Sequence, residues 1–122
     1  MAGRQRLPVP EVVREPPGPG AAFRTIYLNE EGITQREFAE RLHKWLPDLS
    51  FDSVKNKLSD FLNDKKELTW DFAFILAEAS KTSADMWMKR QFGLNKWRAK
   101  QRFYQRIEEL EVEPGSSLYD QA

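Results

Sequence analysis

The chain contains no cysteine and only one histidine. The lack of cysteine excludes disulfides, thiolate metal sites and cysteine nucleophiles. His43 alone cannot form a multi-histidine metal site, and its place in the segment RLHKWL predicts a solvent-facing helix position. Since no nucleophile is paired with a base and no glycine loop could hold a phosphate, we expect neither an enzyme nor a bound cofactor.

Long apolar runs and an excess charge of either sign are also missing. No run approaches the roughly 20 apolar residues of a membrane span, and the N-terminus lacks an apolar signal-peptide core. We therefore expect a cytoplasmic protein without a membrane partner. The 19 basic and 19 acidic residues cancel, so binding to nucleic acid would need local clusters of basic side chains.

Prolines are rare outside the N-terminus, since five of the seven lie within residues 1–20. This composition predicts a flexible N-terminal arm over residues 1–20. Its Arg4 and Arg6 could follow a DNA groove, but a plain tail is the preferred interpretation. Pro114 and Gly115 predict the end of the last helix, which leaves a single domain over residues 21–113 and a tail over 114–122.

Apolar residues between the two ends recur at helical spacing and never alternate with period two, which predicts an all-α fold. Gly32 is expected to cap the first helix, and Thr34 with Glu37 to form a capping box that opens the second. Thr82 and Asp85 suggest a cap for the fifth helix, which Gly93 is expected to bend or break. The expected helices span about 21–31, 34–45, 52–63, 69–80, 83–92 and 95–113.

The helix over 52–63 has the layout of a helix that reads DNA bases. Its apolar residues fall on one side, and Asn56 and Asn63 lie opposite them, with lysines on the two shoulders. Asparagine can bond an adenine edge, aspartate can accept from cytosine, and lysines reach phosphates. The candidate DNA contacts are Thr34, Gln35, Arg36, Lys55, Asn56, Lys57, Ser59, Asp60, Asn63, Lys65 and Lys66. A polar, solvated helix face remains the alternative.

Several short motifs carry a resemblance to a known family. They are Pro19-Gly20, Thr34-Gln35 with Phe38-Ala39, Ser59 to Asn63, Thr69, Thr82-Ser83 with Met86-Trp87, and Trp97-Arg98-Ala99. With these motifs the chain resembles the HigA-like antitoxins within the Xre/Cro group of helix-turn-helix regulators. The resemblance implies a five- to six-helix, lambda-repressor-like bundle that forms a homodimer through its C-terminal helices. It also implies binding to double-stranded DNA at an inverted-repeat operator, and neutralisation of a RelE-type ribonuclease toxin.

By the same resemblance, Gln35 should contact phosphate, and bases and phosphates should be contacted by Lys55, Asn56, Lys57 and Ser59. The sequence departs from the family in the turn HKWLPDLSFDS, which is much longer than the usual Gly-x-Ser. We expect the added apolar residues to pack onto the bundle; they are Trp45, Leu46, Leu49 and Phe51. Further departures are Trp70, Ile75 and Lys81, where the family has proline, arginine and glycine.

The C-terminal helix is basic, because no acidic residue lies between Asp85 and Glu108. Arg98, Arg102 and Arg106 form a stripe that could bind an acidic partner, extend a DNA footprint, pair with the EELEVE segment of a neighbouring subunit, or remain solvated. The preferred function is a sequence-specific DNA-binding regulator of the antitoxin type. The alternatives are a stand-alone or phage-type repressor, and a protein-interaction module that has lost DNA binding.

Overall fold

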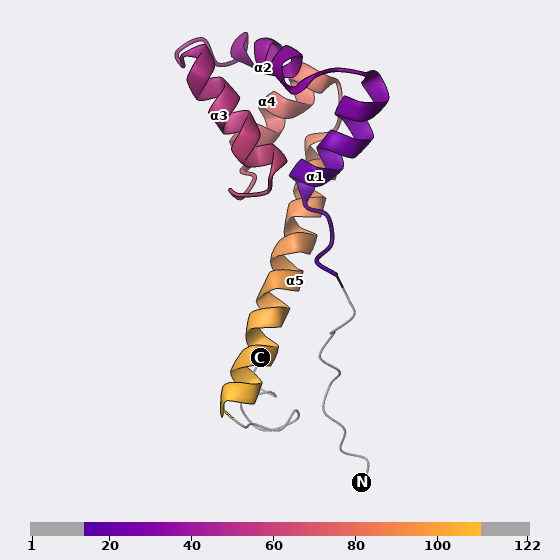
Figure 1. Ribbon diagram of the computed structural model, residues 1–122, viewed down its shortest axis with the longest axis vertical. Helices are drawn as coiled ribbons and strands as arrows, with labels where there is room; N and C mark the ends of the chain where they lie inside the picture. Colours follow the sequence, from indigo (N-terminus) through magenta and orange to yellow (C-terminus); the bar gives the residue numbers. More distant parts are fainter. Residues whose placement is uncertain (1–13, 111–122) are drawn as a thin grey trace. The chain divides into compact units, whose positions relative to one another are not determined.

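The computed structural model describes residues 14–110 and confirms the all-α helix-turn-helix bundle (Figure 1). The described residues contain no strand and no helix long and apolar enough to cross a membrane. They form two compact units, residues 17–94 and residues 14–16 with 95–110. The elements are α1 (Pro19–Phe23), a π-helical segment η1 (Arg24–Asn29), α2 (Gln35–His43), α3 (Phe51–Leu62), α4 (Trp70–Ser80) and α5 (Ala84–Leu110).

The start of α1 is held by the end of α3. The backbone N–H groups of Gly20 and Ala21 donate to the two carboxylate oxygens of Asp64, at 2.9 and 3.0 Å. Pro19 occupies the beginning of α1, where its missing N–H costs nothing. The helix thus begins two residues before the expected start, and Pro19 and Gly20 are buried in the bundle. Arg4, Arg6 and the expected C-terminal tail lie outside the described residues.

Two local predictions about helix ends are confirmed. Gly32 adopts a φ of 66°, and the N–H of Ile33 donates to the carbonyl of Leu28 at 3.0 Å, as in a Schellman cap. At the start of α2, the N–H of Glu37 donates to the Thr34 hydroxyl at 3.0 Å. The N–H of Thr34 donates to the Glu37 carboxylate at 2.8 Å, which completes the capping box.

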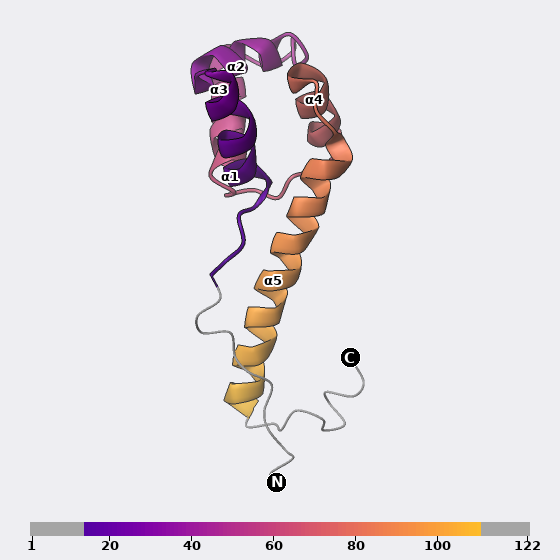
Figure 2. The same cartoon turned by 90° about the vertical axis from the view of Figure 1, so that its right-hand side faces the viewer.

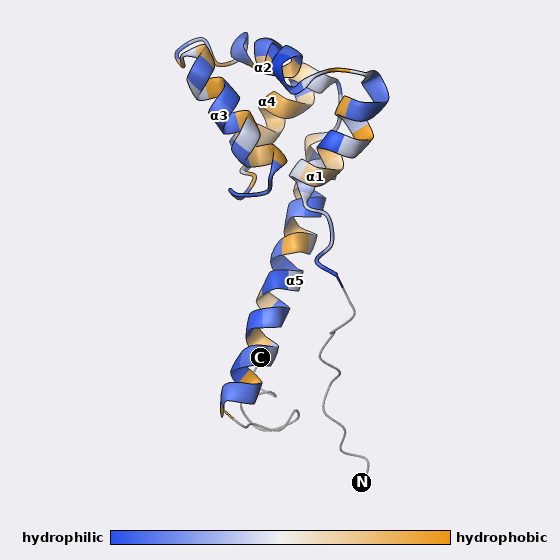
Figure 3. Cartoon of the chain, viewed as in Figure 1, coloured by the Kyte–Doolittle hydropathy of each residue, from blue (hydrophilic) through white to orange (hydrophobic). Residues whose placement is uncertain are grey.

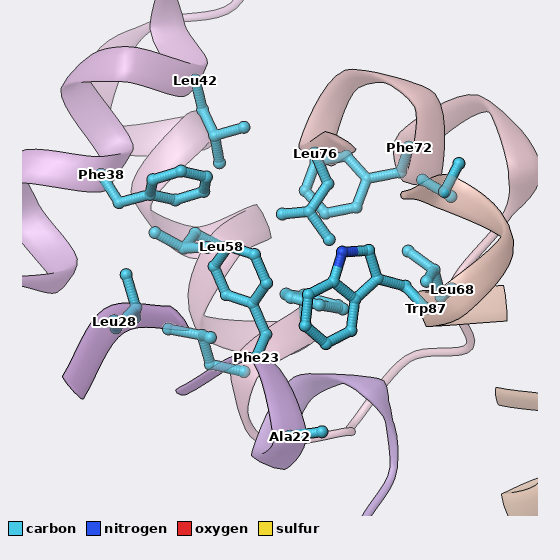
Figure 4. Close-up of a cluster of buried hydrophobic side chains, with 14 of the residues drawn as sticks. Ala22, Phe23, Leu28, Phe38, Leu42, Leu58, Leu68, Phe72, Leu76 and Trp87 are labelled. Atoms are coloured by element: carbon cyan, nitrogen blue, oxygen red, sulfur yellow. The ribbon is translucent and has the colours of Figure 1, made fainter. Parts of the chain in front are cut away.

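One aromatic cluster forms the centre of the 17–94 unit (Figure 4). The Phe23 ring lies 5.1 Å from Phe38, 5.7 Å from Phe61 and 5.1 Å from Trp87, measured between centroids. These four residues come from α1, α2, α3 and α5, so their contacts fix the orientation of α3 within the bundle. Helix α4 adds Phe72, Ala73 and Leu76 to the same core.

Three expectations about helix ends were wrong. Residues 84–110 form one continuous helix, since Gly93 is tolerated at a cost of about 1 kcal/mol. The cap of α5 is Ser83, whose hydroxyl accepts from the N–H of Met86 at 3.3 Å. Thr82 instead accepts a hydrogen bond from the indole N–H of Trp87 at 2.7 Å. Helix α2 ends at His43 rather than Trp45, because the approach to Pro47 disfavours helical backbone.

The long turn between α2 and α3 packs only partly onto the bundle. Leu46 and Phe51 contact the core as expected, but Trp45 stays 51% and Leu49 38% exposed. The turn is closed locally, since the N–H of Trp45 donates to Leu42 and His43 Nε2 donates to the carbonyl of Leu49 at 2.8 Å. His43, the last residue of α2, is therefore partly buried against the turn and is not the solvent-facing residue that we expected.

Lys81 offers a test of backbone strain at the end of α4. It holds a φ of 59°, and the N–H of Thr82 donates to Ala77 at 3.0 Å, so a position suited to glycine carries a side chain. Lys81→Gly is expected to raise the free energy of unfolding by about 1 kcal/mol, measured by urea denaturation. Gly32→Ala is the reverse control and should lower it by a similar amount. A loss of stability in Lys81→Gly would contradict this account.

Candidate nucleic-acid interface

Helices α2 and α3 pack through their apolar sides and leave a polar surface on α3. Phe38 and Leu42 of α2 and Val54 and Leu58 of α3 are all fully buried. The inward face that we expected for α3 is confirmed, since Phe61 and Leu62 are buried as well. At its start, the Ser50 hydroxyl accepts from the N–H of Ser53 at 3.1 Å.

The first group of candidate contacts surrounds the N-terminus of α2. A hollow of about 290 Å³ is lined by Gln35, Arg36, Ala39 and Lys55. The Arg36 guanidinium and the Lys55 ammonium each lie 5.4 Å from the centroid of the Phe51 ring, within the range of a cation–π contact. From the sequence we expected Phe51 only as an apolar residue of the long turn. In the structure its ring holds the Arg36 and Lys55 cations beside the start of α2.

A second group lies between α3 and the start of α4. A hollow of about 450 Å³ is lined in part by Asn56, Lys57, Asp60 and Lys66. Lys66 pairs with Asp60 at 3.4 Å, and the Lys57 ammonium lies 5.1 Å from the Phe72 ring centroid. Asn56 is exposed in the lining of this second hollow, and its neighbour in the sequence, Lys55, lines the first.

Ser59 and Asn63 form a separate group. Asn63 is the C-cap of α3, and its amide donates to the carbonyl of Ser59 at 3.0 Å. Its side-chain oxygen accepts from Arg24 at 3.4 Å. Asn63 therefore lies two turns beyond Asn56 with its amide engaged, although the helical phase predicted one shared face. Arg24 could not be found by sequence reasoning, because it reaches α3 only through the fold.

Thr34 and Lys65 are the remaining candidates, and both form hydrogen bonds within the chain at the ends of helices. The Thr34 hydroxyl is used by the capping box, and the hydrogen bond from the Thr34 N–H holds the pKa of the Glu37 carboxyl below its ordinary value. Lys65 is exposed, and its N–H donates to the carbonyl of Asp60 at 2.9 Å. Lys55 also pairs with Asp52 at 3.4 Å, so acidic residues offset part of the positive charge on this surface.

Among residues 14–110 no cluster of three acidic or histidine side chains could hold a metal ion.

Comparisons with known proteins support a helix-turn-helix regulator. No family model matches the chain. Over 87 residues the chain is 29% identical to YbaQ of Escherichia coli K12, an uncharacterised helix-turn-helix-type transcriptional regulator. The aligned residues cover 71% of this chain and 69% of YbaQ. It is 30% identical over 82 residues to virulence-associated protein A of Dichelobacter nodosus, which covers 66% of this chain and 72% of that protein.

A solved structure shows the same fold. The crystal structure of a hypothetical protein from E. coli superposes with a TM-score of 0.62 at 26% sequence identity. The alignment covers 88% of this chain and 99% of that protein. The named relatives are described as a helix-turn-helix regulator and a virulence-associated protein, and none is described as an antitoxin. The chain belongs to the helix-turn-helix regulator family that includes YbaQ and virulence-associated protein A.

Proposed function

We propose that this chain is a sequence-specific DNA-binding transcriptional regulator whose α3 enters the major groove. The observation that carries the proposal is the exposed Asn56, which lines one hollow together with Lys57 and directly follows Lys55, a residue of the hollow at the start of α2. The opposite side of α3 is fully apolar and buried, so this polar side is the one that remains for DNA.

Each group has a role in this arrangement. Asn56 would bond an adenine edge through both amide atoms. Arg36 and Lys55, held over the Phe51 ring, would contact one phosphate strand beside the N-terminus of α2. Lys57 and Lys66 would contact phosphates at the other hollow. Asp60 is paired with Lys66, so its contact with a cytosine would require that ion pair to open.

Base and phosphate contacts give different mutational results. Asn56→Ala is expected to relax the base preference at one position in each half-site and to cost about 1–3 kcal/mol of binding free energy. Lys55→Ala should weaken binding to every sequence alike and reduce the salt dependence by about one unit, because one phosphate contact is lost. Mobility shifts with the chain's own upstream DNA and with single-base variants measure both effects.

Lys89→Ala, at an exposed position of α5, is the matched control and should leave both quantities unchanged. An unshifted upstream fragment at about 50 mM salt, where phosphate contacts are strong, would refute DNA binding. Unaltered base preference in Asn56→Ala would show that α3 meets the groove through a different face.

We further propose that the regulator acts in the cytoplasm as a homodimer on an inverted repeat, and that it is an antitoxin. The support is the resemblance of the motifs at Thr34-Gln35, Thr82-Ser83 and Trp97-Arg98 to HigA-like antitoxins. Co-expression with adjacent small reading frames, followed by a pull-down, tests the antitoxin role. A toxin-like neighbour that does not bind would contradict it and favour a stand-alone repressor.

A further inference from the structure

Two aspartates lie on the same side of α3 as Asn56. Asp52, Asn56 and Asp60 follow one another every fourth residue, so they form one stripe with about 6 Å between successive members. Asp52 and Asn56 are exposed, and Asp60 lines the same hollow as Asn56. Figure 3 shows that α3 carries hydrophilic residues beside the hydrophobic ones that it buries. A helix that reads bases through Asn56 therefore presents one carboxylate a turn before it and another a turn after it.

Each of these carboxylates is paired with a lysine that is a candidate phosphate contact. The Asp52 carboxylate lies 3.4 Å from the Lys55 ammonium, and the Asp60 carboxylate lies 3.4 Å from the Lys66 ammonium. Lys66 lies in the turn that joins α3 to α4 (Figure 2). The side chains of Asp52 and Lys66 are 87% and 78% exposed, so each pair has a partner in solvent and opens at little cost.

The opening of such a pair has different consequences on different DNA sequences. A lysine that leaves its aspartate for a phosphate leaves a carboxylate that faces the DNA without a cation. Binding to unrelated DNA depends on phosphate contacts alone, so nothing there offsets the unpaired carboxylate. On a matched sequence the carboxylate can accept a hydrogen bond from the amino group of a cytosine, whereas guanine and thymine present only acceptors in the major groove.

We propose that Asp52 and Asp60 are specificity-determining residues, which withhold Lys55 and Lys66 from the phosphates of unrelated DNA. The lysines are released on a sequence that offers a cytosine amino group to each carboxylate. Asn56 then selects a base by attraction, and the two aspartates reject wrong bases by repulsion. At about 6 Å from Asn56 along the helix, each carboxylate meets a base one or two pairs away. The proposal rests on the proposed DNA binding and adds which residues reject other sequences.

The test is a pair of mobility-shift titrations of the full chain, with its own upstream DNA and with an unrelated duplex of equal length and base composition. Asp60→Asn should strengthen binding to the unrelated duplex about fivefold, because Lys66 is released and one repulsive charge is lost. Binding to the upstream DNA should change less than about twofold, since the neutral amide is a weaker acceptor for cytosine. Asp52→Asn should act in the same way. Glu78→Gln, at an exposed position of α4, makes the same change of charge and should leave the affinity ratio unaltered.

A double-mutant cycle separates competition for lysine from a general effect of charge. In a Lys66→Ala background, Asp60→Asn should alter binding to the unrelated duplex by less than about twofold, because no lysine remains to be released. An equal effect of Asp60→Asn with and without Lys66 would overturn the proposal, and so would an unaltered affinity ratio in both aspartate variants. In those cases the upstream DNA is still bound, and the proposed function stands. A wild-type chain that does not prefer its upstream DNA would refute both. Circular dichroism confirms that each variant is folded.

Discussion

Gly20→Ala is expected to lower the free energy of unfolding by about 3 kcal/mol. A Cβ atom on residue 20 would lie 1.8 Å from the carbonyl oxygen of Phe61, which is far inside van der Waals contact. That carbonyl also accepts from the N–H of Asp64 at 3.0 Å, so two backbone segments would have to separate. The same movement would disturb the hydrogen bonds from α1 to the Asp64 carboxylate. Urea denaturation followed by circular dichroism measures the loss.

The matched control is Gly93→Ala in α5. This glycine is exposed inside a helix, and a Cβ there would meet nothing within 4 Å. Alanine should therefore stabilise the chain by about 1 kcal/mol, since glycine loses more backbone entropy on folding. If Gly20→Ala lowers the free energy of unfolding and Gly93→Ala raises it, the close approach of the Phe61 carbonyl to residue 20 is the cause of the loss. Equal stability of Gly20→Ala and the wild-type chain would contradict it.

The features that could be predicted from the sequence depend on near neighbours in the chain. The Thr34–Glu37 capping box and the Gly32 cap each join residues within a few positions, so the residue types suffice. The buried side of α3 follows from helical periodicity, which placed Val54 and Leu58 inward correctly. These local features were enough for the all-α fold and for Asn56 on the exposed side of α3.

The features that could not be predicted join residues far apart in the chain. Asp64 lies just beyond the helix expected over 52–63, yet it caps α1 because the fold brings the end of α3 to Gly20. Asn63 shares the helical phase of Asn56, but Arg24 and Ser59 engage its amide. Trp45 and Leu49 are apolar and still exposed, and local hydrogen bonds close the loop that carries them. Periodicity contains no information on such contacts.

Trp87→Ala is expected to cost about 3–5 kcal/mol of unfolding free energy, the range for a large aromatic removed from a core. Trp87 is fully buried, and its ring lies 5.1 Å from Phe23, whose own contacts reach α2 and α3. The change also removes the donor to Thr82, whose hydroxyl lies 2.6 Å from the Ser80 hydroxyl. Urea denaturation measures the loss in Trp87→Ala.

Trp45→Ala makes the same chemical change at an exposed position of the long turn, so it should alter stability by less than about 0.5 kcal/mol. Trp87→Phe keeps most of the ring volume but leaves Thr82 without its donor, and should cost about 1–3 kcal/mol. If Trp87→Ala and Trp45→Ala were equally mild, the cluster around Phe23 would not be what holds α3 in place. The proposed groove contacts of Asn56 would then lack the rigid support that base recognition requires.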